Sequence, residues 1–272
     1  MPDARSRLSS GGPLLVAALL LGCHASQPPP SAYDYSQGAD VLQAMHDRYA
    51  GRWPQRLVAV QHNLASPRAG DTARTIWLTA VEPPGRMRID FEPRERGNGV
   101  LILQDTQYVI AGGRPTQVTR AIQPLLLLQH DVYFLAATIT AARLRELGVN
   151  VDRVRTDVWQ NRPVFVLGAA AGDLRSKQVW IDRELMVLVR WIEPSLRDSR
   201  LSVDTRLLDY ERMGSAWVPR RIDYYEGDQR IFEQEQRQIR ANLVLDSMLF
   251  RPDDWTRAEH WYQTPVLRRE RR

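Results

Sequence analysis

An alternation of apolar and polar residues recurs along this chain and restricts most of it to antiparallel β-strands. The segment 86–92 is the clearest example, because Met87, Ile89 and Phe91 fall on one side of an extended chain while every residue between them is charged. Such a strand buries one face and keeps the other in water. We therefore expect the charged side, which includes Asp90, to be solvated.

Comparable strand segments lie on both sides of a helical middle region. Two precede segment 86–92, and after Val149 the strands return, with the longest at 202–212, 217–225 and 231–240. Turn signals rich in Gly, Asn, Asp and Pro separate them. The pattern predicts an α+β domain with about ten or eleven antiparallel strands.

Helices are expected at the start and in the middle of the domain. The segment 40–49 places its apolar residues on one helical face. Pro124 suits the first position of a second helix. Thr138 is expected to cap a third helix that runs to Leu147, and Gly148 is expected to end it.

The N-terminus has the three parts of an export signal. A basic start is followed by an apolar run at 13–21 and then by Leu20-Leu21-Gly22-Cys23. The run is far shorter than the roughly 20 residues that cross a bilayer. The last four residues resemble a lipobox, the motif of bacterial lipoproteins. The alternative is an ordinary secretory signal with an incidental cysteine.

The lipobox predicts how the rest of the N-terminus is used. Residues 1–22 form the signal peptide, Cys23 is lipidated, and the Pro-rich segment 23–37 is a flexible tether. Cys23 is the chain's one cysteine, so no disulfide competes for it. His24 stands where lipoproteins kept at the inner membrane often have aspartate. By resemblance to sorted lipoproteins, we expect a lipid anchor in the outer membrane that faces the periplasm.

The charge of the chain does not indicate a nucleic-acid partner. The net charge of +5 comes almost entirely from arginine, as Lys177 is the only lysine. This one-sided usage is more typical of codon bias than of a phosphate-binding surface. The basic C-terminal tail, residues 259–272, is expected to be a solvated terminus; contact with anionic headgroups is the alternative.

Motifs of catalysis and of metal binding are absent. The chain lacks G-x-S-x-G, P-loop and H-E-x-x-H patterns, and its five histidines are scattered without metal-ligand spacing. Acidic residues such as Asp90, Glu92 and Asp182 are interpreted as solvated strand positions. We therefore expect no enzyme activity, no cofactor and no metal.

Excess apolar surface is the feature that points to a ligand. Residues 185–192 form a predicted strand with one fully apolar face and a second face that is apolar except for Arg190. Ordinary core packing explains most of these residues, but a long sheet with few helices is also expected to curve around a cavity. Eight residues are candidates for its lining: Met87, Ile89, Phe91, Leu125, Leu128, Val187, Val189 and Trp191.

Two short stretches resemble the lipoprotein-localisation factors of the LolA/LolB-like superfamily. They are Trp77-Leu78 before Met87-Arg88-Ile89-Asp90, and the run from Lys177 to Asp182 that leads into 185–190. The resemblance covers residues 40–255, within a domain that we place at 38–258. It implies an open antiparallel half-barrel whose concave side is covered by helices and holds acyl chains.

Three functions remain open at this point. The first is a membrane-anchored lipoprotein that binds lipid or lipoprotein acyl chains, in outer-membrane sorting or envelope maintenance. The second is a structural or assembly lipoprotein that docks an envelope protein complex. The third is an envelope hydrolase.

Overall fold

The computed structural model describes residues 35–67 and 70–262. These belong to one compact unit, Tyr35–Arg272. The predicted signal peptide, the lipidation site Cys23 and most of the tether and of the basic tail lie outside the described residues.

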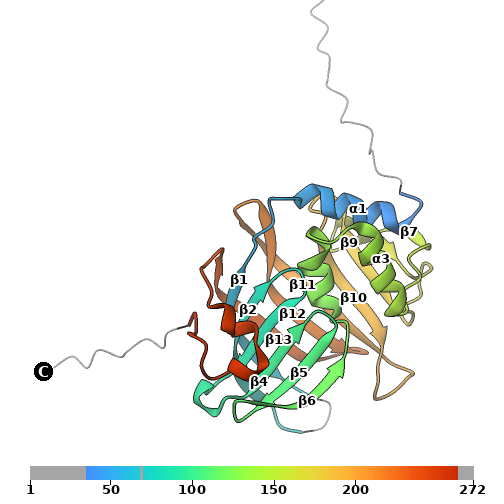
Figure 1. The fold of residues 1–272 in the computed structure, drawn as a ribbon. Helices are drawn as coiled ribbons and strands as arrows, with labels where there is room; N and C mark the ends of the chain where they lie inside the picture. Colours follow the sequence, from blue (N-terminus) through green and yellow to red (C-terminus); the bar gives the residue numbers. More distant parts are fainter. Residues whose placement is uncertain (1–34, 68–69, 263–272) are drawn as a thin grey trace, which may run out of the picture. The chain divides into compact units, whose positions relative to one another are not determined.

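One antiparallel sheet of thirteen strands forms the body of this unit (Figure 1). In sequence order the strands are β1 (Leu57–Ala65), β2 (Ala73–Glu82), β3 (Arg86–Phe91), β4 (Gly99–Leu103), β5 (Thr106–Ala111), β6 (Arg114–Arg120), β7 (Val154–Trp159), β8 (Arg162–Leu167), β9 (Gln178–Asp182), β10 (Leu188–Pro194), β11 (Ser202–Met213), β12 (Ala216–Glu226) and β13 (Gln229–Ala241). Their order across the sheet is β6-β5-β4-β3-β2-β1-β13-β12-β11-β10-β9-β8-β7. The sheet is open, with β6 and β7 at its two edges.

The topology explains why helices cross one face of this sheet. Strands β1–β6 form one meander and β7–β13 form a second, and the pairing of β1 with β13 joins them. The chain must therefore travel from one edge of the sheet to the other between β6 and β7. It does so through α2 (Pro124–Gln129), the 3-10 turn η2 (Asp131–Tyr133) and α3 (Ala137–Glu146).

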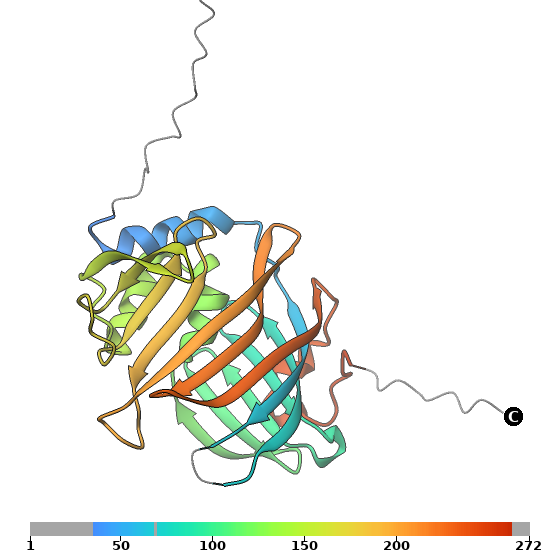
Figure 2. The same ribbon diagram turned by 180° about the vertical axis from the view of Figure 1, so that it is seen from behind.

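The helices and the sheet enclose the largest hydrophobic core. Helix α1 (Gly38–Tyr49) packs beside α3 over β9 and β10 (Figure 1). It buries Val41, Leu42, Met45 and Tyr49, the face that its sequence predicts. Figure 2 shows the opposite face, which the long strands of the second meander cross. The α+β class and the helices on the concave side are confirmed.

The sheet has more strands than the ten or eleven expected, and β6 is a strand that the sequence did not predict. Nearly all of its residues are exposed. An edge strand with two wet faces has no apolar alternation, so its sequence carries no signal of period two.

Helix α3 ends as expected but begins differently. Gly148 has a φ of +90°, its N–H donates to the Arg145 carbonyl, and the N–H of Val149 donates to the Leu144 carbonyl. These two bonds form a Schellman motif, which favours glycine at that position. Thr138, however, lies inside the helix, and Ala136 is the residue before its first turn, without a side-chain cap.

A C-terminal segment, residues 243–262, covers part of the sheet face opposite the helices. It contains the 3-10 turns η3 (Ser247–Phe250) and η4 (Pro252–Asp254). Leu249, Phe250 and Trp255 pack there against Ala80 and Leu101. Across the described residues, none of the helices has the length and apolar character needed to span a membrane.

Candidate functional site

A cavity of about 280 Å³ lies between helix α2 and the concave face of the sheet. Its floor is formed by β1–β4, β12 and β13, and its lining is mainly aliphatic and aromatic. This volume lies near the lower end of the roughly 300–1,000 Å³ typical of ligand pockets. A hollow of about 530 Å³ between Arg74 and Glu235 is larger, but charged side chains line it. The apolar cavity is therefore the better candidate for a ligand site.

The three apolar residues predicted on β3 lie in this cavity. Met87, Ile89 and Phe91 all line it, and all three are only half-buried. Val100, which pairs with Ile89 in register on the next strand, is half-buried as well. Apolar side chains on the inner face of a packed sheet are normally buried completely. Their partial exposure shows that this region of the concave face is hollow.

Helix α2 forms the roof and divides its leucines between two environments. Leu125 and Leu126 line the cavity. Leu127 and Leu128 point away from it and belong to the main hydrophobic core, where Leu128 is fully buried. Of the two candidates on this helix, Leu125 therefore borders the cavity and Leu128 does not.

The later strand contributes one of its three predicted residues. Val187 lines the cavity. Val189 borders a separate hollow beside Trp159 and Asp182, and Trp191 is buried in the main core. The strand begins only at Leu188, and its register with β9 shifts after that residue. This bulge breaks the alternation that the sequence pattern assumed.

An aromatic group at one end of the cavity was not predicted. Trp53 and Tyr133 stack with their ring centroids 3.9 Å apart, and the His130 ring lies 6.3 Å from that of Trp53. All three residues line the cavity. Burial lowers the pKa of His130 to about 4, so its ring is neutral at physiological pH. These residues come from loops and a 3-10 turn, where the sequence has no periodic signal.

Uncharged polar side chains complete the lining, and most of them are glutamines. The sequence contains one signal for these polar residues. Along β1 the apolar inner face of Leu57 and Ala59 continues into Gln61, which lines the cavity and is buried. A polar residue on a buried face indicates a site that needs hydrogen bonds.

A buried carboxyl group ties the roof to the rim of the sheet. Asp131 follows α2, and its Oδ1 accepts a hydrogen bond from the N–H of Gly85 in the β2–β3 turn, at 2.9 Å. Burial raises the pKa of Asp131 to about 6, despite the opposing effects of that hydrogen bond and of Arg143. The end of α2 is thus fixed by a group that titrates within the range of ordinary pH.

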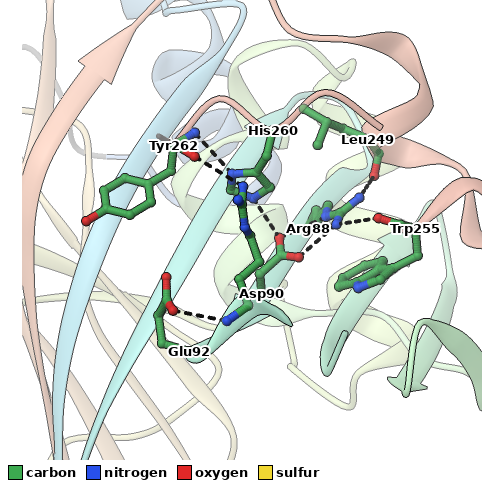
Figure 3. Close-up of polar contacts among 8 residues, drawn as sticks. Arg88, Asp90, Glu92, Leu249, Trp255, His260 and Tyr262 are labelled. Carbon is green, nitrogen blue, oxygen red and sulfur yellow. Dashed lines mark hydrogen bonds and ion pairs between the residues drawn. The ribbon is translucent and has the colours of Figure 1, made fainter. Parts of the chain in front are cut away.

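On the opposite face of β3, the C-terminal segment is held by a buried charged cluster (Figure 3). The Arg88 guanidinium donates to both Asp90 oxygens, at 2.8 and 2.7 Å, and also to the carbonyls of Leu249 and Trp255. It stacks 3.7 Å from the centroid of the Trp255 ring. His260 Nε2 lies 3.1 Å from Asp90 Oδ2.

This cluster corrects the expectation that the acidic strand residues are solvated. Asp90 and Asp182 are each only 1% exposed. Burial opposes the ionisation of Asp90, but hydrogen bonds from His260 and Arg88 outweigh it and keep the pKa of Asp90 below its ordinary value. Asp182 accepts hydrogen bonds from the N–H groups of Glu184 and Leu185 and so shapes the turn that precedes Val187.

In the ranges 35–67 and 70–262, no three or more His, Cys, Asp or Glu side chains gather in a way that could hold a metal ion. The cavity provides shape, apolar contact and hydrogen-bonding amides.

Comparison with known proteins relates this fold to others. Neither the protein-family models nor the curated proteins contain a match. Solved structures do match. A domain from Vibrio parahaemolyticus, named for outer membrane lipoprotein sorting, is 12% identical with a TM-score of 0.52, over 81% of this chain and 96% of that one. A DUF1329 family protein from Desulfovibrio piger is 14% identical with a TM-score of 0.50, over 78% and 95%.

The chain has a LolA-like fold. A LolA superfamily protein from Nitrosomonas europaea also matches, at 12% identity and a TM-score of 0.48, over 76% of this chain and 94% of that one. In this chain the LolA-like sheet places its hollow between β1–β4 and α2, and the C-terminal segment packs on its other face.

Proposed function

We propose that this chain is a membrane-anchored lipoprotein that binds acyl chains of lipids or lipoproteins in the cavity under α2. Its role would be outer-membrane lipoprotein or lipid sorting, or maintenance of the envelope. The observation that carries the proposal is the row of half-buried apolar side chains, Met87, Ile89 and Phe91, on the concave face. The likeness of the fold to a domain named for lipoprotein sorting supports it.

The energetics of acyl chains suit such a site. A chain of about 15 methylenes gains on the order of 10 kcal/mol on leaving water, at about 0.8 kcal/mol per methylene. A bilayer offers a similar gain, so a carrier needs only to approach the affinity of the membrane to exchange its ligand. No catalyst and no cofactor is required for that exchange.

Docking of an envelope protein complex has less support. The large apolar residues that are well exposed, such as Val118, Val158 and Leu196, lie on separate elements. Single exposed apolar residues are normal on a protein surface and do not form an interface.

The proposed anchor is tested by Cys23→Ala. A mature lipoprotein carries two or three acyl chains, enough for stable membrane attachment. We expect the variant to lose labelling with radioactive palmitate and to accumulate uncleaved or soluble, as fractionation after a carbonate wash would show. A protein that is anchored by acyl chains stays in the membrane fraction during the carbonate wash. Full retention of the variant there would contradict the anchor.

In a second variant, His24→Asp is expected to move the protein toward the inner membrane in a density gradient.

The proposed ligand is tested by extraction. The Cys23→Ala chain, purified from a bacterial host without detergent, is extracted with organic solvent, and the extract is analysed by mass spectrometry. We expect acyl lipid in near-stoichiometric amount. Ile89→Asp, which places a charge in the cavity, should abolish it. Ile76→Asp, on the exposed outer face of the neighbouring strand, should not. A lipid-free extract from the parent would favour the docking role.

A further inference from the structure

Every described residue that lines the cavity is uncharged, although 25% of the residues in the chain are charged. The polar part of the lining consists of side chains with neutral hydrogen-bonding groups. Apart from tyrosines and tryptophans, these are Gln61, Thr79, Gln107, Gln123, Gln129, His130, Gln234 and Gln236. Such a lining can satisfy a neutral polar ligand group but offers no charge to balance an ion.

Gln61 lies on the cavity floor, where two hydrogen bonds hold its side-chain oxygen. Its Oε1 accepts from Thr79 Oγ1 at 2.8 Å and from Gln234 Nε2 at 3.0 Å. Because its oxygen already accepts these two bonds, this amide, which is only 7% exposed, has its Nε2 donors to offer a ligand.

The aromatic end of the cavity has an unpaired donor as well. The Nε1–H of Trp53 and the Nδ1 of His130 are buried, and neither has a partner within the residues that the structure describes. An indole N–H acts only as a donor. Buried polar groups are normally paired, and an unpaired donor in the wall of a cavity therefore indicates a ligand acceptor.

Neutral N–H donors in an apolar cavity match the carbonyl oxygen of an ester or an amide. We propose that this cavity selects acyl compounds whose head is an uncharged ester or amide over free fatty acids whose carboxylate is ionised. The inference rests on the acyl-binding function proposed above and specifies the class of acyl compound.

Electrostatics opposes the ionised head group. Moving a carboxylate out of water is costly unless a cation or several strong donors replace the lost hydration. None of the arginines and lysines among the described residues lines the cavity. His130 cannot serve as the counter-ion at physiological pH, because burial lowers its pKa to about 4.

The test compares two ligands that differ in charge and hardly in size, dodecanoate and dodecanamide. Their binding to the delipidated Cys23→Ala chain is measured by isothermal titration calorimetry at pH 8. We expect the amide to bind at least about tenfold more tightly, because the carboxylate must be buried without a counter-ion. Equal affinities would overturn the selectivity and leave the acyl-binding function standing. Failure of both compounds to bind would contradict the acyl-binding function itself.

A charge placed in the lining should reverse the preference. Gln236 is half-buried, lines the cavity and pairs in register with Gln61. In Gln236→Lys we expect dodecanoate to gain affinity and to equal or exceed the amide. Gln117→Lys, the same substitution on the exposed edge strand β6, should leave the preference unchanged. An unchanged preference in Gln236→Lys would contradict the proposal.

Two neutral esters distinguish the sources of such a ligand. They are 1-dodecanoylglycerol, which represents a membrane glycerolipid, and a diacylglyceryl-cysteine peptide, which represents a lipoprotein N-terminus. Binding of either one supports the shared ester chemistry and assigns its source. Failure of both esters to bind, in a protein that binds dodecanoate, would overturn the inference.

Discussion

Arg88 and Asp90 lie two residues apart on β3, and both are buried under the C-terminal segment. The alternation of this strand predicts that they share a face, which is correct. It cannot show that residues more than 150 positions later return to cover that face. A buried ion pair of this kind holds two distant parts of the chain together through one guanidinium.

Removing the Asp90 carboxylate should therefore lower the stability of the fold. In Asp90→Ala the Arg88 guanidinium stays buried without its bidentate partner, a situation that typically costs about 3–5 kcal/mol. We expect a loss of that size in the free energy of unfolding, measured by urea denaturation. Proteolysis near Trp255 should become faster, since the C-terminal segment loses the contact between His260 and Asp90, and Arg88, which donates to the Trp255 carbonyl, loses the carboxylate that holds it in place.

Glu235 and Arg237 provide a matched control. They also lie two residues apart on one strand and form an ion pair, but their side chains are 45% and 50% exposed. Exposed pairs contribute about 1 kcal/mol or less. Glu235→Ala should thus have a small effect, and a loss in Asp90→Ala no larger than in this control would contradict the structural role of the buried pair.

Residue-level prediction of the cavity succeeded where the strand was regular. Met87, Ile89 and Phe91 follow an unbroken alternation, and all three line the cavity. Val189 and Trp191 were assigned to the same face as Val187, but Met186 has a φ of +53° and a bulge follows Leu188. Local backbone irregularities of this type have no counterpart in a pattern of apolar residues.

At the scale of the elements, apolar periodicity predicted α1, the helical middle region and the long strands. It failed for β6, which is exposed on both faces, and for the start of α3. The polar part of the lining was missed for a related reason. Glutamines such as Gln107 and Gln123 are unremarkable in a sequence, and only the fold brings them to one hollow.

The joint between α2 and the β2–β3 turn should respond to pH through Asp131. Because its folded-state pKa is raised to about 6 from an ordinary 3.8, its contribution to stability is full at low pH and is lost as the pH rises through 6. Asp131→Asn removes this ionisation, while its amide oxygen can still accept the Gly85 N–H. We expect the variant to be more stable than the parent at pH 7.5, by up to roughly 3 kcal/mol.

The comparison is made by urea denaturation of both proteins at several values between pH 4 and pH 7.5. His130 titrates in the opposite sense, because its pKa is lowered to about 4 and its protonation destabilises the fold in acid. That effect is common to both proteins and cancels in their difference. The difference in free energy of unfolding between variant and parent should shrink toward pH 4. A constant difference across the pH range would rule out Asp131 as the titrating group.

At the scale of the whole domain, the order of the strands produces the cavity. Two meanders joined by β1 and β13 leave their free edges far apart, so the connection between them crosses the concave face as α2 and α3. A connection of this length covers only part of a thirteen-stranded sheet. The region under α2 that this connection leaves unfilled is the cavity. On a strand that borders it, one residue can therefore face the hollow while the next residue faces packed core on the other side of the sheet.

Val100 and Leu101 on β4 are such neighbours and allow the last prediction. Val100 is half-buried and lines the cavity, whereas Leu101 is fully buried against the C-terminal segment. Val100→Phe should obstruct the cavity, strongly reduce bound acyl lipid and leave the free energy of unfolding almost unchanged. Leu101→Phe should overpack the core, cost about 1–3 kcal/mol and leave lipid binding by the folded protein intact. Urea denaturation and mass spectrometry of extracted lipid measure both effects. Equal destabilisation by the two substitutions, with lipid retained in each, would mean that the concave face is packed core.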